Sequence, residues 1–237
     1  MGKIGKNSLD IQESNRLSIL RILAGEDVLT RAELSRRTGL KQATITNIIN
    51  AFLASGVVSE TGALKGNLGR RSIGIRINAE KFNVVAIKIA RRSYSVGIFN
   101  IKNQLLEKEY QKLDPAAGAS AVLERIVSDA RSLMQKYGSC CAVGVAVPGP
   151  YLRREGRIAV MTEFAGWEKI DICKQLGAAF EQPVFVEHDA NAGALGEWSR
   201  SANIGRDDVL VHLLASEGIG AGVVIGGKII SGYRGIF

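Results

Sequence analysis

Cysteine is scarce in this sequence of 237 residues, which contains only Cys140, Cys141 and Cys173. Their spacing fits neither a set of metal ligands nor a disulfide framework. We therefore expect reduced, buried thiols and no metal site, and the sequence excludes disulfide-stabilised scaffolds.

Long apolar runs are also missing. No stretch approaches the ~20 apolar residues that a helix needs to cross a bilayer, and residues 1–7 lack the apolar core of a signal peptide. We expect a soluble, cytoplasmic protein with no membrane partner. Hydrophobic residues still make up 46% of the chain, which is enough for a packed core in one large domain or two smaller ones.

Positive charge is concentrated near the start of the chain. The formal net charge is +8, and residues 1–80 carry 12 Lys and Arg against 7 Asp and Glu, whereas residues 81–237 carry 19 against 16. A basic excess favours polyanionic partners, and its place in the first third suits a segment that binds nucleic acid.

Helical periodicity dominates residues 17–55. Apolar residues predict a first helix that ends near Gly25. Thr-Arg-Ala-Glu at 30–33 matches a capping box that begins a short second helix. Gly39 permits a tight turn before a third helix over residues 41–55. In the first helix the apolar residues Leu17, Leu20 and Ala24 recur at helical spacing, and Ile19 and Leu23 flank them.

The third helix has an apolar face, formed by Ile45, Ile48, Ile49, Phe52 and Leu53, and an opposite face that is short, polar and uncharged. A merely solvated face more often carries Glu and Lys. Gln, Asn and Thr side chains form hydrogen bonds with base edges in a major groove, and neighbouring basic residues reach phosphates. The predicted DNA contacts are Arg36, Arg37, Lys41, Gln42, Ala43, Thr46 and Asn47.

A β-hairpin is predicted after this helix, from residues 57–61 and the alternating Ile73, Ile75 and Ile77. Its tip includes Arg70 and Arg71, which either insert a guanidinium into a minor groove or form a solvated loop. Helix, helix, turn, helix and wing together are typical of a winged helix-turn-helix, so the expected partner is a double-stranded DNA operator.

From residue 82 onward the pattern changes to that of an α/β domain, with strands, helix and strands in alternation. We place the domain boundary between residues 79 and 80. The predicted elements are strands 83–89, 94–100 and 104–110, helix 118–137, strand 140–147, helix 170–180, strand 183–187 and a hairpin over 209–225.

A weak internal repeat relates residues 84–100 to residues 209–225, since each is strand, turn and strand. Two such hairpins clamp nucleotide phosphates in actin-like ATPases, where close backbone approach to phosphate needs glycine. The second turn, 216–222, contains three glycines, whereas the first turn, 90–93, contains none.

Four segments together resemble the ROK family, which contains sugar kinases and sugar-responsive repressors: 143–150, Gly166-Trp167, 187–197 and 217–222. The N-terminal winged helix resembles the repressor branch. The resemblance implies a winged helix-turn-helix at 1–79, followed at 80–237 by an α/β domain of the actin-like ATPase (ribonuclease H-like) fold.

The resemblance also implies a sugar site at His188, Asp189 and Glu163, with Asp189 at the position of the general base in family kinases. His188 stands where relatives carry asparagine, and the alternative is that it only ends a strand. Residues 88–91, Lys-Ile-Ala-Arg, replace the Asp-Gly-Gly-Thr-like phosphate loop of the kinases. We therefore expect no enzyme activity.

Family members continue beyond the position of Phe237 with a zinc site and most of a second lobe. We therefore expect an incomplete second lobe, no zinc and no other cofactor. The favoured function is a sugar-responsive repressor of carbohydrate-metabolism genes, acting as a homodimer or tetramer. The alternatives are a sugar kinase with an appended DNA-binding domain, and a constitutive DNA-binding protein whose second domain only mediates dimerisation.

Overall fold

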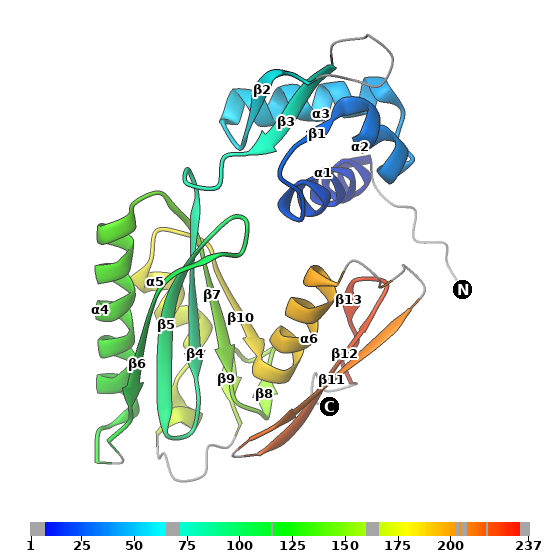
Figure 1. The fold of residues 1–237 in the computed structure, drawn as a ribbon. Coiled ribbons are helices and arrows are strands. Elements are labelled where there is room, and N and C mark those ends of the chain that lie inside the picture. Colours follow the sequence, from blue (N-terminus) through cyan, green and yellow to red (C-terminus); the bar gives the residue numbers. More distant parts are fainter. Residues whose placement is uncertain are drawn as a thin grey trace. The chain divides into compact units, whose positions relative to one another are not determined.

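The computed structural model describes residues 8–64, 72–114, 116–159, 166–201, 204, 208–216 and 218–232. The chain divides into two compact units, one formed by residues 1–82 with 101–103 and the other by residues 83–100 with 104–237. Figure 1 shows the helices and strands of both. No helix in the described ranges is long and apolar enough to cross a membrane.

The first unit is a winged helix-turn-helix, as predicted. Its strands form an antiparallel sheet in the order β1-β3-β2. Its described elements are α1 (Ser8–Ala24), β1 (Leu29–Thr30), α2 (Arg31–Thr38), α3 (Gln42–Ser55), β2 (Val58–Leu64) and β3 (Ser72–Ile77).

Local signals set the ends of these helices. The Thr30 hydroxyl accepts a hydrogen bond from the Glu33 amide at 3.2 Å, and the Glu33 carboxylate accepts one from the Thr30 amide at 2.7 Å. This is the predicted capping box. Gly39 and Gly56 end α2 and α3 with φ near +70°, a conformation that glycine adopts without steric cost.

The helical spacing of the apolar residues in α1 did not decide which of them face the core. Ile19 and Leu23 are 0% and 1% exposed, whereas Leu17 is 50% exposed. Both apolar sets have helical spacing, so periodicity alone does not choose between them. Packing against the other helices determines which set is buried, because Ile19 and Leu23 belong to the core cluster that contains Leu34 and Ile45.

The second unit is built on a mixed sheet in the order β10-β7-β4-β5-β6. β4, β5 and β6 form the predicted antiparallel meander, and β7 and β10 join in parallel. The elements of this layer are β4 (Asn83–Ile89), β5 (Ser93–Asn100), β6 (Leu105–Lys112), α4 (Ala119–Tyr137), β7 (Cys140–Val147), β8 (Tyr151–Leu152), β9 (Arg157–Ile158), η1 (Trp167–Lys169), α5 (Ile172–Ala179) and β10 (Val184–His188).

One face of this sheet carries the core. Val85, Ile87 and Val145 are buried against α4 and α5, which lie on the same side of the sheet (Figure 1). Because side chains alternate along a strand, the residues between them face the other way. That second face bears small residues such as Ala86 and Gly144, and it forms the floor of the cleft described below.

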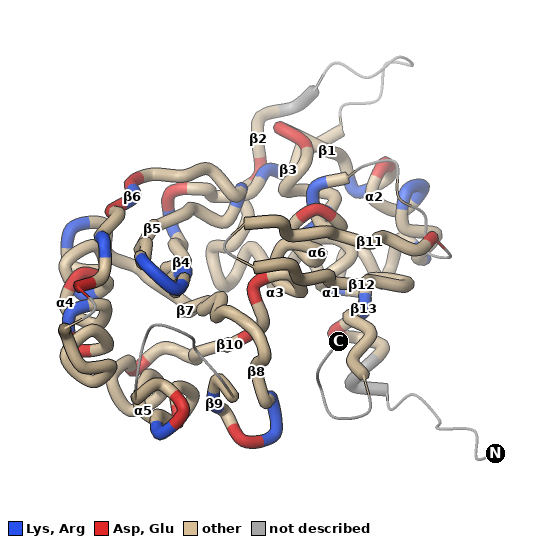
Figure 2. The backbone as a smooth tube through the Cα atoms, turned by 90° about the horizontal axis from the view of Figure 1, so that it is seen from below, with Lys and Arg blue, Asp and Glu red and all other residues tan. Residues whose placement is uncertain are grey.

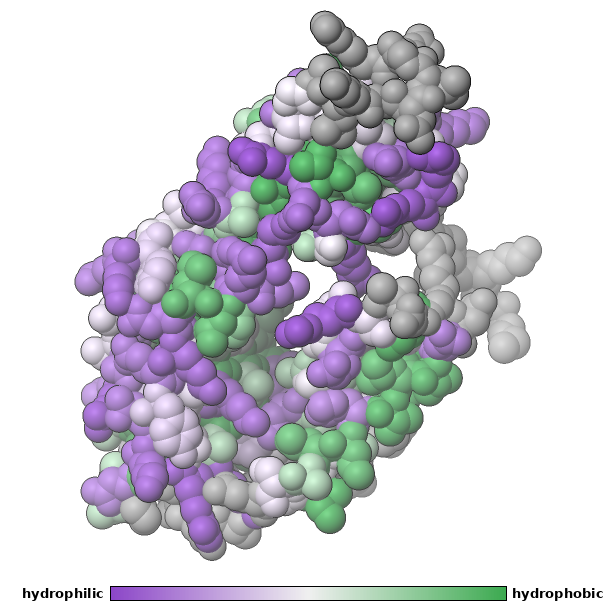
Figure 3. All heavy atoms as spheres, viewed as in Figure 1, coloured by the Kyte–Doolittle hydropathy of each residue, from purple (hydrophilic) through white to green (hydrophobic). Residues whose placement is uncertain are grey.

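A second layer consists of α6 (Asp189–Arg200) with β11 (Val209–Ala215), β12 (Ile219–Ile225) and β13 (Lys228–Ile229). The three strands are antiparallel, and one face of β11 and β12 packs on α6. The opposite face carries exposed apolar side chains over β11 and β12 (Figure 3). They are Val209, Val211, Leu213, Ile219 and Ile225.

The expectation of three buried thiols was wrong. Cys140 is half-buried, and Cys141 and Cys173 are exposed. Cys141 is the extra residue of a β-bulge, because Asn83 pairs with Cys140 and the next residue of β4 pairs with Ala142. Cys173 lies on α5, with its Sγ 3.1 Å from the Tyr151 hydroxyl oxygen.

Candidate functional site

The exposed face of α3 has the composition that the sequence indicates. Ile45, Ile48, Ile49 and Phe52 are buried beneath it. Gln42, Ala43, Asn47 and Asn50 are exposed and Thr46 is half-buried. The helix contains no charged residue, so its accessible hydrogen-bonding side chains carry amides and hydroxyls. Such a face is suited to base edges, with charge supplied by its neighbours.

Those neighbours lie at the end of α2 and in the turn before α3. Arg36 and Lys41 are exposed, and Figure 2 shows basic residues on α2. The Arg37 guanidinium is paired with Glu26, with Nη1 2.6 Å from Oε1. A surface pair of this kind is weak enough to be exchanged for a phosphate. Arg70 and Arg71, predicted at the wing tip, lie outside the described residues.

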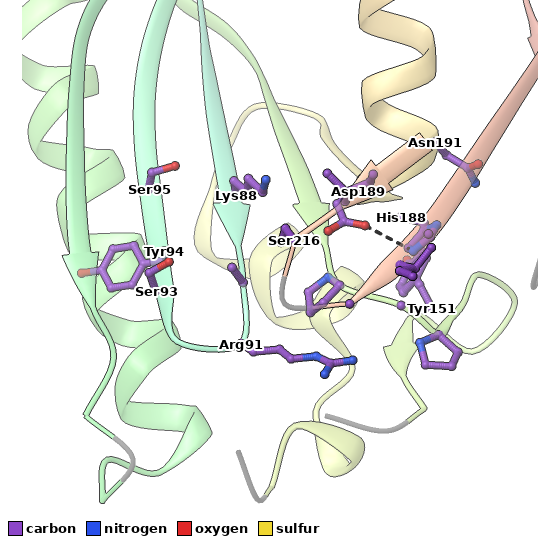
Figure 4. Close-up of a pocket in the computed structure, with 18 of the residues that line it drawn as sticks. Lys88, Arg91, Ser93, Tyr94, Ser95, Tyr151, His188, Asp189, Asn191 and Ser216 are labelled. Carbon is purple, nitrogen blue, oxygen red and sulfur yellow. Dashed lines mark ion pairs between the residues drawn. The ribbon is translucent and has the colours of Figure 1, made fainter. Parts of the chain in front are cut away.

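A separate cleft of about 500 Å³ opens within the second unit, a volume typical of small-molecule sites. Figure 4 shows its polar side chains. Its walls come from β4 to β6, the segment after β7, the start of α6 and the β11–β12 hairpin. The polar and charged residues that line it are Lys88, Arg91, Ser93, Tyr94, Ser95, Lys108, Tyr110, Tyr151, His188, Asp189, Asn191, Ser216 and Ser231.

His188 lies between two glycines. A Cβ on Gly149 would be 2.5 Å from its Nε2, and a Cβ on Gly220 would be 3.5 Å from its Cε1. The imidazole therefore occupies space that side chains at these positions would fill. His188 ends β10 and precedes α6, so its position at the end of a strand does not exclude a role in the cleft, which its ring lines.

Asp189 is held at the first turn of α6. One carboxylate oxygen accepts a hydrogen bond from the Ala190 amide at 2.8 Å and lies 3.2 Å from His188 Nε2 (Figure 4). Both side chains are largely buried. The structure thus brings together the predicted pair, His188 and Asp189. Glu163, the third predicted member, lies outside the described residues.

Glu187 forms hydrogen bonds with residues next to this pair. Its Oε1 accepts hydrogen bonds from the His188 amide at 2.9 Å and from Asn191 Nδ2 at 3.1 Å, and its Oε2 pairs with Arg153. Asn191 is only 8% exposed, and its Oδ1 has no partner within the described part of the chain. Asn191 also lines the cleft.

The glycines of the β11–β12 hairpin do not form the turn that the sequence predicted. Gly220 and Gly222 lie in β12. A Cβ on Gly222 would be 2.7 Å from the carbonyl carbon of Ala190 and 2.8 Å from Cα of Asn191. These two glycines therefore allow α6 to approach β12, and only Gly218 remains in the turn. The β4–β5 turn contains Arg91 in place of glycine.

The sequence did not show that Lys88 and Lys108 lie together on the cleft floor. Ala146, Lys88, Ser95 and Tyr110 follow one another across β7, β4, β5 and β6 in register, so they share one face of the sheet. Lys108 lies two residues before Tyr110 on that same face. In the sequence, Lys88 interrupts the apolar run of β4, but which residues lie beside it depends on the strand register. No three His, Cys, Asp or Glu side chains cluster as metal ligands in the described ranges.

Two family models match the chain. The ROK family model matches residues 84–237, and a model described as winged helix-turn-helix DNA-binding matches residues 12–59. The chain is 24% identical to the xylose repressor of Caldicellulosiruptor bescii over 98% of its own length. It spans about 58% of the length of that relative.

Solved structures agree with this assignment. A ROK family transcriptional regulator, a homologue of the E. coli MLC protein, aligns with 95% of this chain and 58% of its own at a TM-score of 0.74 and 21% identity. A ROK hexokinase from Thermus thermophilus aligns with 65% of this chain and 50% of its own at a TM-score of 0.56 and 32% identity. The chain belongs to the ROK family, and it carries the winged helix-turn-helix of that family's transcriptional regulators.

Proposed function

We propose that this protein is a sequence-specific DNA-binding repressor of carbohydrate-metabolism genes, with residues 1–79 as the DNA-binding domain and residues 80–237 as a sugar-responsive domain. The observation that carries the proposal is the uncharged polar face of α3, exposed over a fully apolar underside. The curated relative named above is a repressor whose name states xylose, which supports a carbohydrate signal for this chain.

The exposed face of α3 would contact the bases, and the basic residues beside it would contact the phosphates. Gln42 and Asn47 are the side chains able to form bidentate hydrogen bonds with adenine, and Ala43 and Thr46 offer methyl groups to thymine. Arg36, Arg37 and Lys41 fix the register on the backbone, together with Arg70 and Arg71 of the wing. A homodimer or tetramer would present two such helices to half-sites one or two helical turns apart.

Selection from fragmented genomic DNA tests this function. The purified 237-residue chain is expected to enrich a pseudo-palindromic motif, and Asn47→Ala is expected to weaken or alter it. Asn50→Ala, on the same face one turn further along the helix, shows how far the contact extends. Recovery of fragments without any common motif would contradict the proposal.

The sugar site is proposed at His188 and Asp189, with Glu163 as a third contact. A carboxylate accepts two sugar hydroxyls, and a histidine donates or accepts one. Asp189 and His188 lie at the carboxyl end of β10, where α/β folds place ligands. A ligand that prefers one arrangement of the cleft walls would change DNA affinity by a coupling energy of about 1–3 kcal/mol.

The alternative is a ROK sugar kinase with an appended DNA-binding domain, and the retained Asp189 carboxylate in the cleft favours it. Phosphoryl transfer depends on backbone amides and positioned charge around the phosphates. In this chain the β4–β5 turn contains Arg91, and Gly220 and Gly222 are packed against α6. Few backbone amides are therefore left to bind a phosphate, and we propose that the chain is not an enzyme. Sugar-dependent ATP turnover that Asp189→Asn abolishes would establish the kinase instead.

A further inference from the structure

The first helix, α1, carries an apolar stripe that the fold does not bury. Ile19 and Leu23 fill the core of the first unit, whereas Leu17 is 50% exposed, and Leu20 and Ala24 are half-buried at the edge of that core. The proposed DNA contacts lie on α2, α3 and the wing, so they give this stripe no role. Apolar residues that line up on an exposed helix face, unlike scattered ones, mark an interaction surface.

Two charged residues flank Leu17 on the same side of α1. Glu13 lies four residues before it and Arg21 four residues after it, about one helical turn away in each direction, and both are exposed. They are separated by about 12 Å along the helix axis, whereas side chains within one helix pair at spacings of three or four residues. The stripe therefore runs from a negative end through an apolar centre to a positive end.

Such a stripe is complementary to itself when two copies meet in antiparallel orientation. With a two-fold axis at Leu17, the two leucines are in contact, Glu13 faces the partner's Arg21, and Arg21 faces the partner's Glu13. A parallel orientation would place like charges opposite each other. An acidic or a basic partner would match only one end of the stripe. Charge complementarity thus favours a second copy of this chain as the occupant, and it sets the direction of packing.

We propose that α1 joins two copies of this chain by antiparallel packing about Leu17, with Glu13 and Arg21 paired across the two-fold axis. The inference rests on the proposed DNA-binding function, because it supplies the surface that holds two DNA-binding units over adjacent half-sites. One helix pair is small beside the roughly 1,200–2,000 Å² of a stable interface. The contact is therefore weak between free copies, and it is reinforced on one operator, where the effective concentration of the two units is high.

Disulfide cross-linking of the 237-residue chain under mild oxidation traps a weak contact of this kind. Cys140, Cys141 and Cys173 are first replaced by serine, and Leu17→Cys then places a thiol at the two-fold axis. Ile11→Cys is the matched control, because Ile11 is 46% exposed and lies about 120° away around the same helix. Leu17→Cys is expected to form covalent dimers roughly tenfold faster than the control, and faster again on operator DNA.

Exchange of charge tests the pairing across the axis. The quantity measured, by fluorescence anisotropy, is the gain in affinity for a duplex with two half-sites over a duplex with one, so that direct effects of charge on DNA binding cancel. Glu13→Arg and Arg21→Glu are each expected to reduce this gain roughly fivefold, because two exposed ion pairs are lost. The double variant is expected to restore it. Arg16→Glu is the matched control, because it reverses the charge of an exposed residue outside the stripe.

Several results would overturn the inference. These are cross-linking of Ile11→Cys as fast as that of Leu17→Cys, no cross-link from Leu17→Cys with or without DNA, or a double variant that fails to restore the gain lost in Glu13→Arg and Arg21→Glu. Circular dichroism establishes that each variant is folded. Cross-linking of the free chain needs no operator, and enrichment of a DNA motif is measured on the wild type, so the proposed regulator and this surface fail independently.

Discussion

Substitution of Gly222 by alanine tests the packing that shapes the cleft. The new Cβ would lie 2.7 Å from the carbonyl carbon of Ala190 and 2.8 Å from Cα of Asn191. Both neighbours are backbone atoms of α6, so no side-chain rotation relieves the overlap. The helix or the strand must move, and a forced fit of this kind costs about 1–3 kcal/mol.

The assay is thermal unfolding followed by tryptophan fluorescence. Both tryptophans, Trp167 and Trp198, belong to the second unit, so the signal reports on that unit. For a domain of its size, 1 kcal/mol corresponds to about 2–4 °C in Tm. Gly222→Ala is therefore expected to lower the Tm by roughly 2–12 °C, and to weaken any ligand that binds at Asp189.

Gly196→Ala is the matched control in α6. A Cβ at Gly196 would meet nothing within 4 Å, and alanine in a helix interior is more stable than glycine by about 0.5–1 kcal/mol. This variant should raise the Tm. An unchanged or higher Tm for Gly222→Ala, with Gly196→Ala behaving as expected, would refute the argument that glycine is needed for the approach of α6 to β12.

Three further predictions concern the first unit. Thr30→Ala should destabilise it by about 1 kcal/mol, measured by denaturant unfolding, because the capping box is lost. The backbone hydrogen bond from Thr30 lowers the pKa of Glu33. The ionised Glu33 carboxylate should therefore stabilise the fold fully above its ordinary pKa of about 4.5, and this stabilisation should vanish as the pH falls through the lowered pKa. Glu33→Gln removes this contribution. A gap between wild type and Glu33→Gln that widens in acid would contradict this sign. Arg36→Gln should weaken binding to all duplexes alike and reduce the slope of affinity against salt by about 1, measured by fluorescence anisotropy. A sequence-dependent effect would assign Arg36 to base contact.

The sequence predicted the elements well where the signal is local. The Thr30 capping box, the turn at Gly39 and the two faces of α3 each depend on a few neighbouring residues, and each is confirmed. The sequence did not decide the core face of α1, because two apolar stripes have the same spacing. Only contact with other elements selects Ile19 over Leu17.

The cleft was harder to predict because its lining residues come together only in the folded structure. The glycine pattern near residue 220 suggested a phosphate-binding turn. In the structure, residue 222 must be small because α6 approaches it closely. Lys88 and Lys108 are 20 residues apart in the sequence, and only the pairing of β4 with β5 and of β5 with β6 brings them to one face. The pair of His188 and Asp189 was predicted because the segment 187–197 resembles the ROK family.

Affinity for a selected operator against a scrambled duplex of the same length and composition tests the central claim most directly. The claim is that the exposed face of α3 reads DNA sequence. Wild-type protein should prefer the operator, and Asn47→Ala should lose about 1–3 kcal/mol of that preference, or roughly 5- to 150-fold, while its affinity for the scrambled duplex stays the same. Equal affinity of the wild type for both duplexes, or an operator preference that Gln42→Ala and Asn47→Ala both leave intact, would contradict it.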